Sequence, residues 1–103
     1  MTELQASVRI GPFDYQVLRP KSIDGGDTWG KFDAGNAVIS IVAKVPTKIH
    51  AKEIFLHELL HGLWYHSGLN DKADEELIVR QLASSLMVFV RQHPWFLDWL
   101  KDA

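Results

Sequence analysis

The sequence AKEIFLHELLHGLWYHSG, residues 51–68, carries the pattern His-x-x-x-His, formed by His57 and His61, with Glu58 directly after the first histidine. Successive residues of an α-helix are about 100° apart, so the two histidines would project from one face of a helix, one turn apart. Two imidazoles placed in this way can bind one Zn²⁺ at about 2.0–2.1 Å. Glu58 would project beside the ion, where a general base for a water molecule is needed. The stretch therefore predicts two metal ligands and a base on one helix.

The helix that contains this pattern is expected to begin at Pro46-Thr47 and to run to about Ser67. Thr47 is a suitable N-cap residue, and Gly68 is well placed to end the helix in the left-handed conformation. The helix is rich in large apolar residues: Leu56, Leu59, Leu60, Leu63 and Trp64. We therefore expect it to be largely buried.

A catalytic zinc site normally has a third protein ligand and one open position. His66 follows His61 by five residues, which places it about 140° further around the helix and on the wrong side. His50 lies two turns before His57, about 10 Å along the axis, and is expected to be a surface residue. The third ligand should therefore come from another element.

The second predicted helix ends near Gln92 and begins after a cap at Asn70 or Asp71, with Glu75 and Glu76 in its first turn. Glu75 shares a helical face with Ile78, Leu82, Leu86 and Phe89, whereas Glu76 shares one with Val79, Ala83, Met87 and Val90. A small residue lets two helices approach closely, which favours Glu76 over Glu75 as the third ligand. If neither binds metal, Glu76 would form an exposed pair with Arg80 on the helix surface.

The first half of the chain has the alternating pattern of short strands. We expect two strands around a turn at Gly11-Pro12, a loop over residues 20–27, and strands over 29–33 and 36–42. In the last strand Ala37, Ile39 and Ile41 would face the core, and Val38, Ser40 and Val42 would face the opposite side. Consecutive strands of this kind predict a small antiparallel sheet. An edge strand beside the histidine helix could pair with an extended peptide, although the sequence does not indicate which strand is the edge.

The composition indicates a single α+β domain over residues 1–103, with the sheet packed on the histidine helix and on a second, ligand-bearing helix. A short last helix over residues 94–101 would cover the core with its aromatic residues.

The chain has no cysteine, so any metal must be held by His, Asp or Glu. A net charge of −2 gives no reason to expect binding to nucleic acid. No signal peptide or membrane span is recognisable, so we expect a cytoplasmic protein.

The motifs HELLHGLWYH and EELIVRQLASSLM together resemble the ImmA/IrrE-type zinc metallopeptidases, which are gluzincins with an HExxH helix and a glutamate on the next helix. Aligning the family's glutamate with Glu76 places Ala83 at the family's alanine and Leu86-Met87 at its two leucines, whereas Val79 and Arg80 depart from the pattern. The specific motifs cover residues 57–87. The chain is most similar to the minimal phage or prophage forms.

The resemblance implies that His57, His61 and Glu76 bind Zn²⁺ and that Glu58 is the general base in hydrolysis of a peptide or protein substrate. A second donor to the oxyanion is usually required, and four residues are candidates: Tyr15, Tyr65, His66 and His93. The alternative is a metal-stabilised phage accessory or protein-interaction module that cleaves nothing. The sequence leaves the oligomeric state open.

Overall fold

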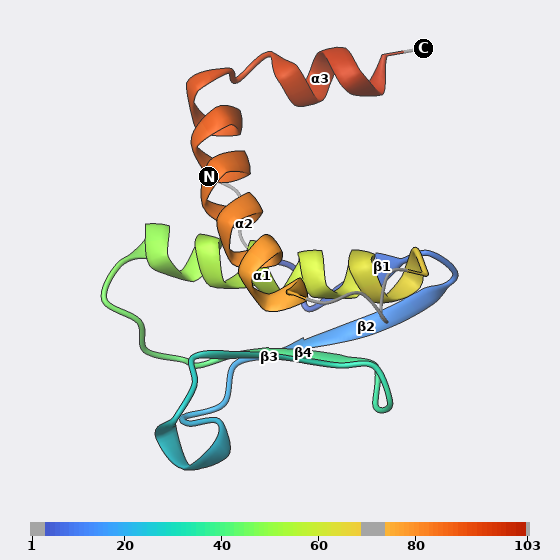
Figure 1. Ribbon diagram of the computed structural model, residues 1–103. Coiled ribbons are helices and arrows are strands. Elements are labelled where there is room, and N and C mark those ends of the chain that lie inside the picture. The colour runs from blue at the N-terminus through green and yellow to red at the C-terminus, as the bar shows by residue number, and fades with distance from the viewer. Residues whose placement is uncertain (1–3, 69–73, 103) are drawn as a thin grey trace.

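Four strands in the first half of the chain form one sheet, and three helices follow them (Figure 1). The computed structural model describes residues 4–68 and 74–102. The strands are β1 (Ser7–Ile10), β2 (Phe13–Leu18), β3 (Gly30–Asp33) and β4 (Val38–Ile41), and a short 3₁₀ helix, η1 (Asp24–Gly26), precedes β3. The helices are α1 (Lys48–His66), α2 (Glu75–Gln92) and α3 (Phe96–Lys101). The architecture is therefore α+β, as predicted.

The sheet is mixed, and the prediction of an antiparallel sheet was wrong. Its strand order is β1-β2-β4-β3, in which β2 and β4 run parallel and the other two pairs are antiparallel. After β2, the connection over residues 19–29 passes the position next to β2 and leads to β3 at the edge of the sheet. Strand β4 then fills the position between β2 and β3. The central position suits β4 because its residues Ile39 and Ile41 are completely buried.

Strand β4 begins two residues later than predicted. Ala37 has a left-handed backbone with φ of 55°, and its N–H donates to the Ala34 carbonyl in a turn, so it cannot continue the strand. Ile39 and Ile41 face the core as expected, and Ile39 packs with Ile10 and Tyr15. Val42, which the alternation assigned to the opposite face, is also buried, just beyond the end of the strand.

Helix α1 has the predicted ends but not the predicted burial. The Thr47 hydroxyl accepts a hydrogen bond from the His50 N–H at 3.1 Å, and Gly68 has the left-handed φ of 84°. Only Glu58 and Gly62 are fully buried on this helix. The sheet covers one side of α1 and α2 covers part of another, so the remaining side, including Leu63, stays exposed.

Gly62 lets α1 approach the sheet closely. A Cβ atom at this position would lie 2.7 Å from Cδ1 of Ile10 and 3.1 Å from Cε1 of Phe32. Both distances are shorter than ordinary van der Waals contact, and Ile10 belongs to the buried core. The glycine therefore sets the spacing between α1 and strands β1 and β3.

Helix α2 crosses α1 and then extends away from the sheet (Figure 1). Its two fully buried residues, Val79 and Ala83, lie on the side that packs against α1. Asp74, with a left-handed φ of 62°, immediately precedes α2 and makes no side-chain cap. The predicted caps, Asn70 and Asp71, lie outside the described residues.

Helix α3 lies at the far end of α2, away from the sheet (Figure 1). Its aromatic residues do not cover the core, contrary to the prediction. Trp99 is 63% exposed, and the preceding Trp95 is 56% exposed. The contact of α3 with α2 is made by Phe96, whose ring lies edge-on to Phe89 with centroids 5.0 Å apart. No helix in the described part of the chain has the length and apolar character needed to cross a membrane.

Replacing Gly62 with alanine should destabilise the fold, although alanine is the better helix former by about 1 kcal/mol. Overpacking a filled core typically costs about 1–3 kcal/mol, so we expect a net loss of about 1 kcal/mol in the free energy of unfolding. Urea denaturation measures this loss.

The matched control adds Ile10→Val, which removes the Cδ1 atom that the new methyl group would meet. The double variant should lose less stability than the sum of the two single variants. Strict additivity of the two single losses would contradict this account of the helix–sheet spacing.

Candidate metal centre

The crossing of α1 and α2 brings together three side chains that can bind a metal: His57, His61 and Glu76. Nε2 of His57 lies 2.8 Å from Oε1 of Glu76, and Nε2 of His61 lies 3.0 Å from Oε2 of the same carboxylate. The two Nε2 atoms are 3.2 Å apart. One histidine pair from α1 and one carboxylate from the first turn of α2 thus converge on a common point.

The spacing of these atoms fits the size of a zinc site. Tetrahedral ligands about 2.0–2.1 Å from a common ion are about 3.3–3.4 Å from one another. The observed separations of 2.8, 3.0 and 3.2 Å are slightly smaller, so a small outward movement of the side chains would accommodate an ion. The donor set of two histidines and one glutamate is one that catalytic zinc sites use.

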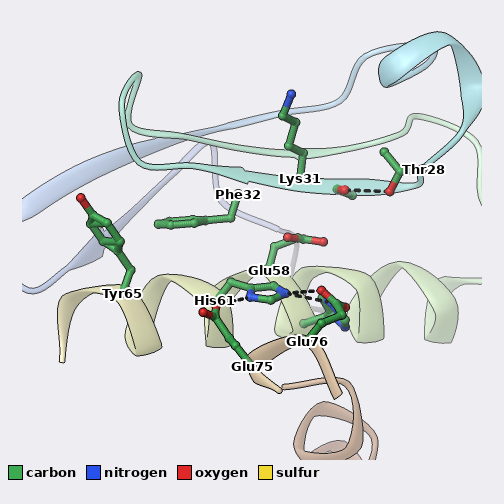
Figure 2. A pocket seen from close by; sticks show the side chains of 10 residues that line it. Thr28, Lys31, Phe32, Glu58, His61, Tyr65, Glu75 and Glu76 are labelled. Atoms are coloured by element: carbon green, nitrogen blue, oxygen red, sulfur yellow. Dashed lines mark hydrogen bonds and ion pairs between the residues drawn. The ribbon is translucent and has the colours of Figure 1, made fainter. Parts of the chain in front are cut away.

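Glu75 contacts the other side of the His61 ring. Its Oε2 lies 2.7 Å from Nδ1 of His61, and a carboxylate can only accept, so Nδ1 donates (Figure 2). In neutral His61 the proton is then on Nδ1, and Nε2 presents its lone pair to Glu76 and His57. A cation bound at this point would be held by the lone pair of His61 Nε2, by Nε2 of His57 and by the Glu76 carboxylate. Glu75 is therefore placed to orient a ligand, in the manner of the outer carboxylates of metal sites.

Glu58 is held between α1 and the edge strand β3. Its side chain projects toward the strand that carries Lys31 and Phe32 (Figure 2), and the residue is only 8% exposed. Burial raises the pKa of Glu58 to about 7; the nearby His61 opposes this rise, and the Glu76 carboxylate adds to it. A carboxyl group with a pKa near 7 can both accept and return a proton at neutral pH.

The room for Glu58 is provided by Gly30 at the start of β3. A Cβ atom at Gly30 would lie 2.8 Å from Oε2 of Glu58 and 2.7 Å from Cγ2 of Ile54. Any other residue at position 30 would displace the carboxyl group or the helix. A glycine in a strand often marks such a close approach, so Gly30 in the stretch WGKF was the available sequence signal for this space.

The candidate metal ligands line a cleft between β3 and the two helices. One cavity of about 400 Å³ is bordered by Gly30, Phe32, Glu58, Tyr65 and the candidate ligands. A second cavity of about 310 Å³ shares several of these residues and continues along α1 past Trp29 and His50 to Ala83. Ala83 thus lies where the two helices approach closely, as the small side chain suggested.

The other histidines are placed away from the cluster. His66 shares a hydrogen bond of 2.6 Å with the hydroxyl of Tyr15, and burial raises the pKa of that hydroxyl. His50 is exposed in the first turn of α1, with Nδ1 2.7 Å from the Thr47 hydroxyl. His93 follows the last residue of α2, and its Nδ1 lies 2.8 Å from the carbonyl oxygen of Phe89. Of the four candidate oxyanion donors, Tyr65 alone is among the residues that border the two cavities.

The sequence predicted Glu75 only as a competing ligand and did not predict its contact with His61. The adjacent pair Glu75-Glu76 at the start of a helix was the available signal, because neighbouring residues point about 100° apart and can contact different atoms of one ring.

Comparisons with protein-family models, with curated proteins and with solved structures found no match for this chain.

Proposed function

We propose that this chain is a zinc-dependent peptidase of the minimal gluzincin type. The observation that carries the proposal is the convergence of His57, His61 and Glu76 on one point, with Glu58 lining the same cleft. His57, His61 and Glu76 would hold the ion, and Glu75 would keep the His61 ring in the tautomer that a metal requires. When bound, Zn²⁺ would supply Lewis acidity, lowering the pKa of a water molecule and polarising a carbonyl oxygen.

Glu58 would move the proton. Its carboxylate accepts a proton from the attacking water and passes it to the amine that leaves, so the carboxylate is regenerated at the end of the reaction. Burial between α1 and β3 shields this group from bulk water and fixes its direction. Tyr65, on the border of the cleft, is the candidate for the second contact with the oxyanion.

The open edge of β3 would align the substrate. The Val42 N–H donates to the Trp29 carbonyl, so alternation along the antiparallel pair turns the backbone groups of Gly30 and Phe32 away from β4. The Gly30 carbonyl accepts a hydrogen bond from the Thr28 hydroxyl at 3.1 Å, which leaves its second lone pair and the backbone groups of Phe32 to pair with an extended peptide. Peptide bonds of the bound strand would then lie beside Glu58, which supports a peptide or protein as the substrate.

Matched amide variants distinguish the roles of the two adjacent glutamates. Glu76→Gln removes the charged ligand and should weaken zinc binding by at least about 100-fold, whereas Glu75→Gln still offers an oxygen to Nδ1 of His61 and should cost about tenfold. Metal content after dialysis and competition with a chromophoric chelator measure both effects. Loss of zinc in Glu75→Gln alone would show that the ligand assignment is reversed.

Zinc should also stabilise the fold, because the ligands come from two helices. At a free zinc concentration about 100 times Kd, the stabilisation is about 2.7 kcal/mol, which corresponds to a rise in Tm of about 10–20 °C for a domain of this size. Addition of a chelator should remove this rise in the natural chain and have no effect on His57→Ala. An identical Tm with and without chelator in the natural chain would mean that the histidine pattern is accidental.

The Glu58→Gln variant should bind zinc normally and lose hydrolysis by about 10²–10⁴-fold, because the amide cannot accept the proton. A library of quenched fluorescent peptides, assayed with zinc-loaded protein, provides the measurement. If Glu58→Gln cleaved peptides as fast as the natural chain, the role of Glu58 would be refuted. If zinc bound tightly and neither protein cleaved any peptide, the site would be a structural one.

Gly30→Ala tests whether the space beside Glu58 matters for the reaction. The added methyl group should displace the carboxyl group, retain zinc, and lower hydrolysis by about 100-fold, the typical cost of a misplacement of about 1 Å. Gly35→Ala is the matched control, because its Cβ would meet only Asp33 at an ordinary distance of 3.6 Å. Equal activity in the two variants would contradict the positioning role of Gly30.

A further inference from the structure

One side of α2 carries an apolar stripe that α1 and the sheet leave uncovered, and its last residue, Phe89, contacts Phe96 of α3. The stripe consists of Ile78, Leu82, Leu86 and Phe89, which recur at intervals of four, four and three residues and therefore lie along one side of the helix. Each is exposed, and Leu82 is 52% exposed. The stripe lies beside the face that contains Val79 and Ala83 and packs on α1, so it is a second apolar surface of the same helix.

The exposure continues into the C-terminal arm, which we define as residues 84–102. The arm comprises the second half of α2 and the whole of α3, and it extends away from the sheet and α1 (Figure 1). Trp95, Leu97 and Trp99 are each about half exposed or more. Large apolar residues gathered in this way on a projecting segment mark an interaction surface.

The accessible surface area of the chain is larger than that of a typical monomer of the same mass. A monomeric protein of 11.7 kDa typically exposes about 5,900 Å², whereas this chain exposes 7485 Å², an excess of about 1,600 Å². The radius of gyration of 14.0 Å likewise exceeds the value of about 12.8 Å that is typical of a domain of this length. A standard interface buries about 800 Å² on each partner, so the excess is sufficient for a stable dimer.

The charges of the arm favour a second copy of this chain as the partner. The arm contains two basic residues, Arg91 and Lys101, and two acidic residues, Asp98 and Asp102. It therefore presents no net charge that would attract an acidic or basic partner, and two copies would not repel each other. An apolar stripe on a straight helix is also self-complementary, because two copies related by a two-fold axis can lay the same stripe against itself.

We propose that the protein is a two-fold symmetric dimer in which the stripes of two α2 helices pack against each other and the aromatic residues of α3 extend the contact. The stripe begins one turn after Glu75, so the interface lies next to the metal centre but contains none of its candidate ligands. Dimerisation is thus independent of the zinc-dependent activity proposed above.

The test is sedimentation equilibrium of the full chain across the micromolar range. The natural chain should sediment with twice the 11.7 kDa mass of one chain. The variant Leu82→Glu/Phe89→Glu, which places two charges in the stripe, should sediment as a monomer while retaining the zinc content and circular dichroism spectrum of the natural chain. These two readouts separate loss of the dimer from loss of the fold.

Val88→Glu is the matched control, because it introduces the same charge at an exposed apolar position of α2 outside the stripe. It should remain dimeric. A natural chain that is monomeric throughout the range would overturn the proposal, including the case in which the monomer binds vesicles of phosphatidylcholine and phosphatidylglycerol through its tryptophans. A folded dimer that persists in Leu82→Glu/Phe89→Glu would overturn it as well.

Discussion

The close crossing of α1 and α2 at Val79 and Ala83 is the constraint on which the candidate site depends. Both residues are fully buried, and the small side chain of Ala83 lets the first turn of α2 lie against the histidine face of α1. His57 and His61 are fixed by one helix alone, but Glu76, the third candidate ligand, can reach them only if this crossing is maintained. The sheet acts on the other side, because Gly62 brings α1 close to β1 and β3, and Gly30 leaves space for Glu58. Two helices and one edge strand are thus spaced by small residues.

The parts of this arrangement that depend on local sequence could be predicted. The ends of α1 follow from Thr47 and Gly68, the histidines follow from helical periodicity, and the choice of Glu76 follows from the face that contains Ala83. The strand order could not be predicted, because the parallel pairing of β2 with β4 joins segments separated by a whole further strand. Alternation within a strand identifies its faces but not its neighbours.

The same distinction explains the errors at the C-terminus. The apolar residues of α3 have the spacing expected of a core helix, and periodicity alone does not reveal what lies opposite them. The direction in which α2 leaves α1 decides this, and that direction takes the last helix away from the sheet (Figure 1). The contact of Glu75 with His61 was missed for a related reason, since it depends on how the α2 helix is rotated about its own axis.

The position of the two glutamates in the first turn of α2 gives this helix the geometry of a lever. Its pivot is the crossing with α1, midway between Val79 and Ala83. At a rise of 1.5 Å per residue, Gln92 lies about 16 Å along the axis from this pivot and Glu76 about 8 Å from it on the other side. A tilt of about 10° would therefore move the carboxylate end by about 1 Å and the far end by about 3 Å. A displacement of the carboxylates too small to break the fold is thus roughly doubled at the opposite end of the helix.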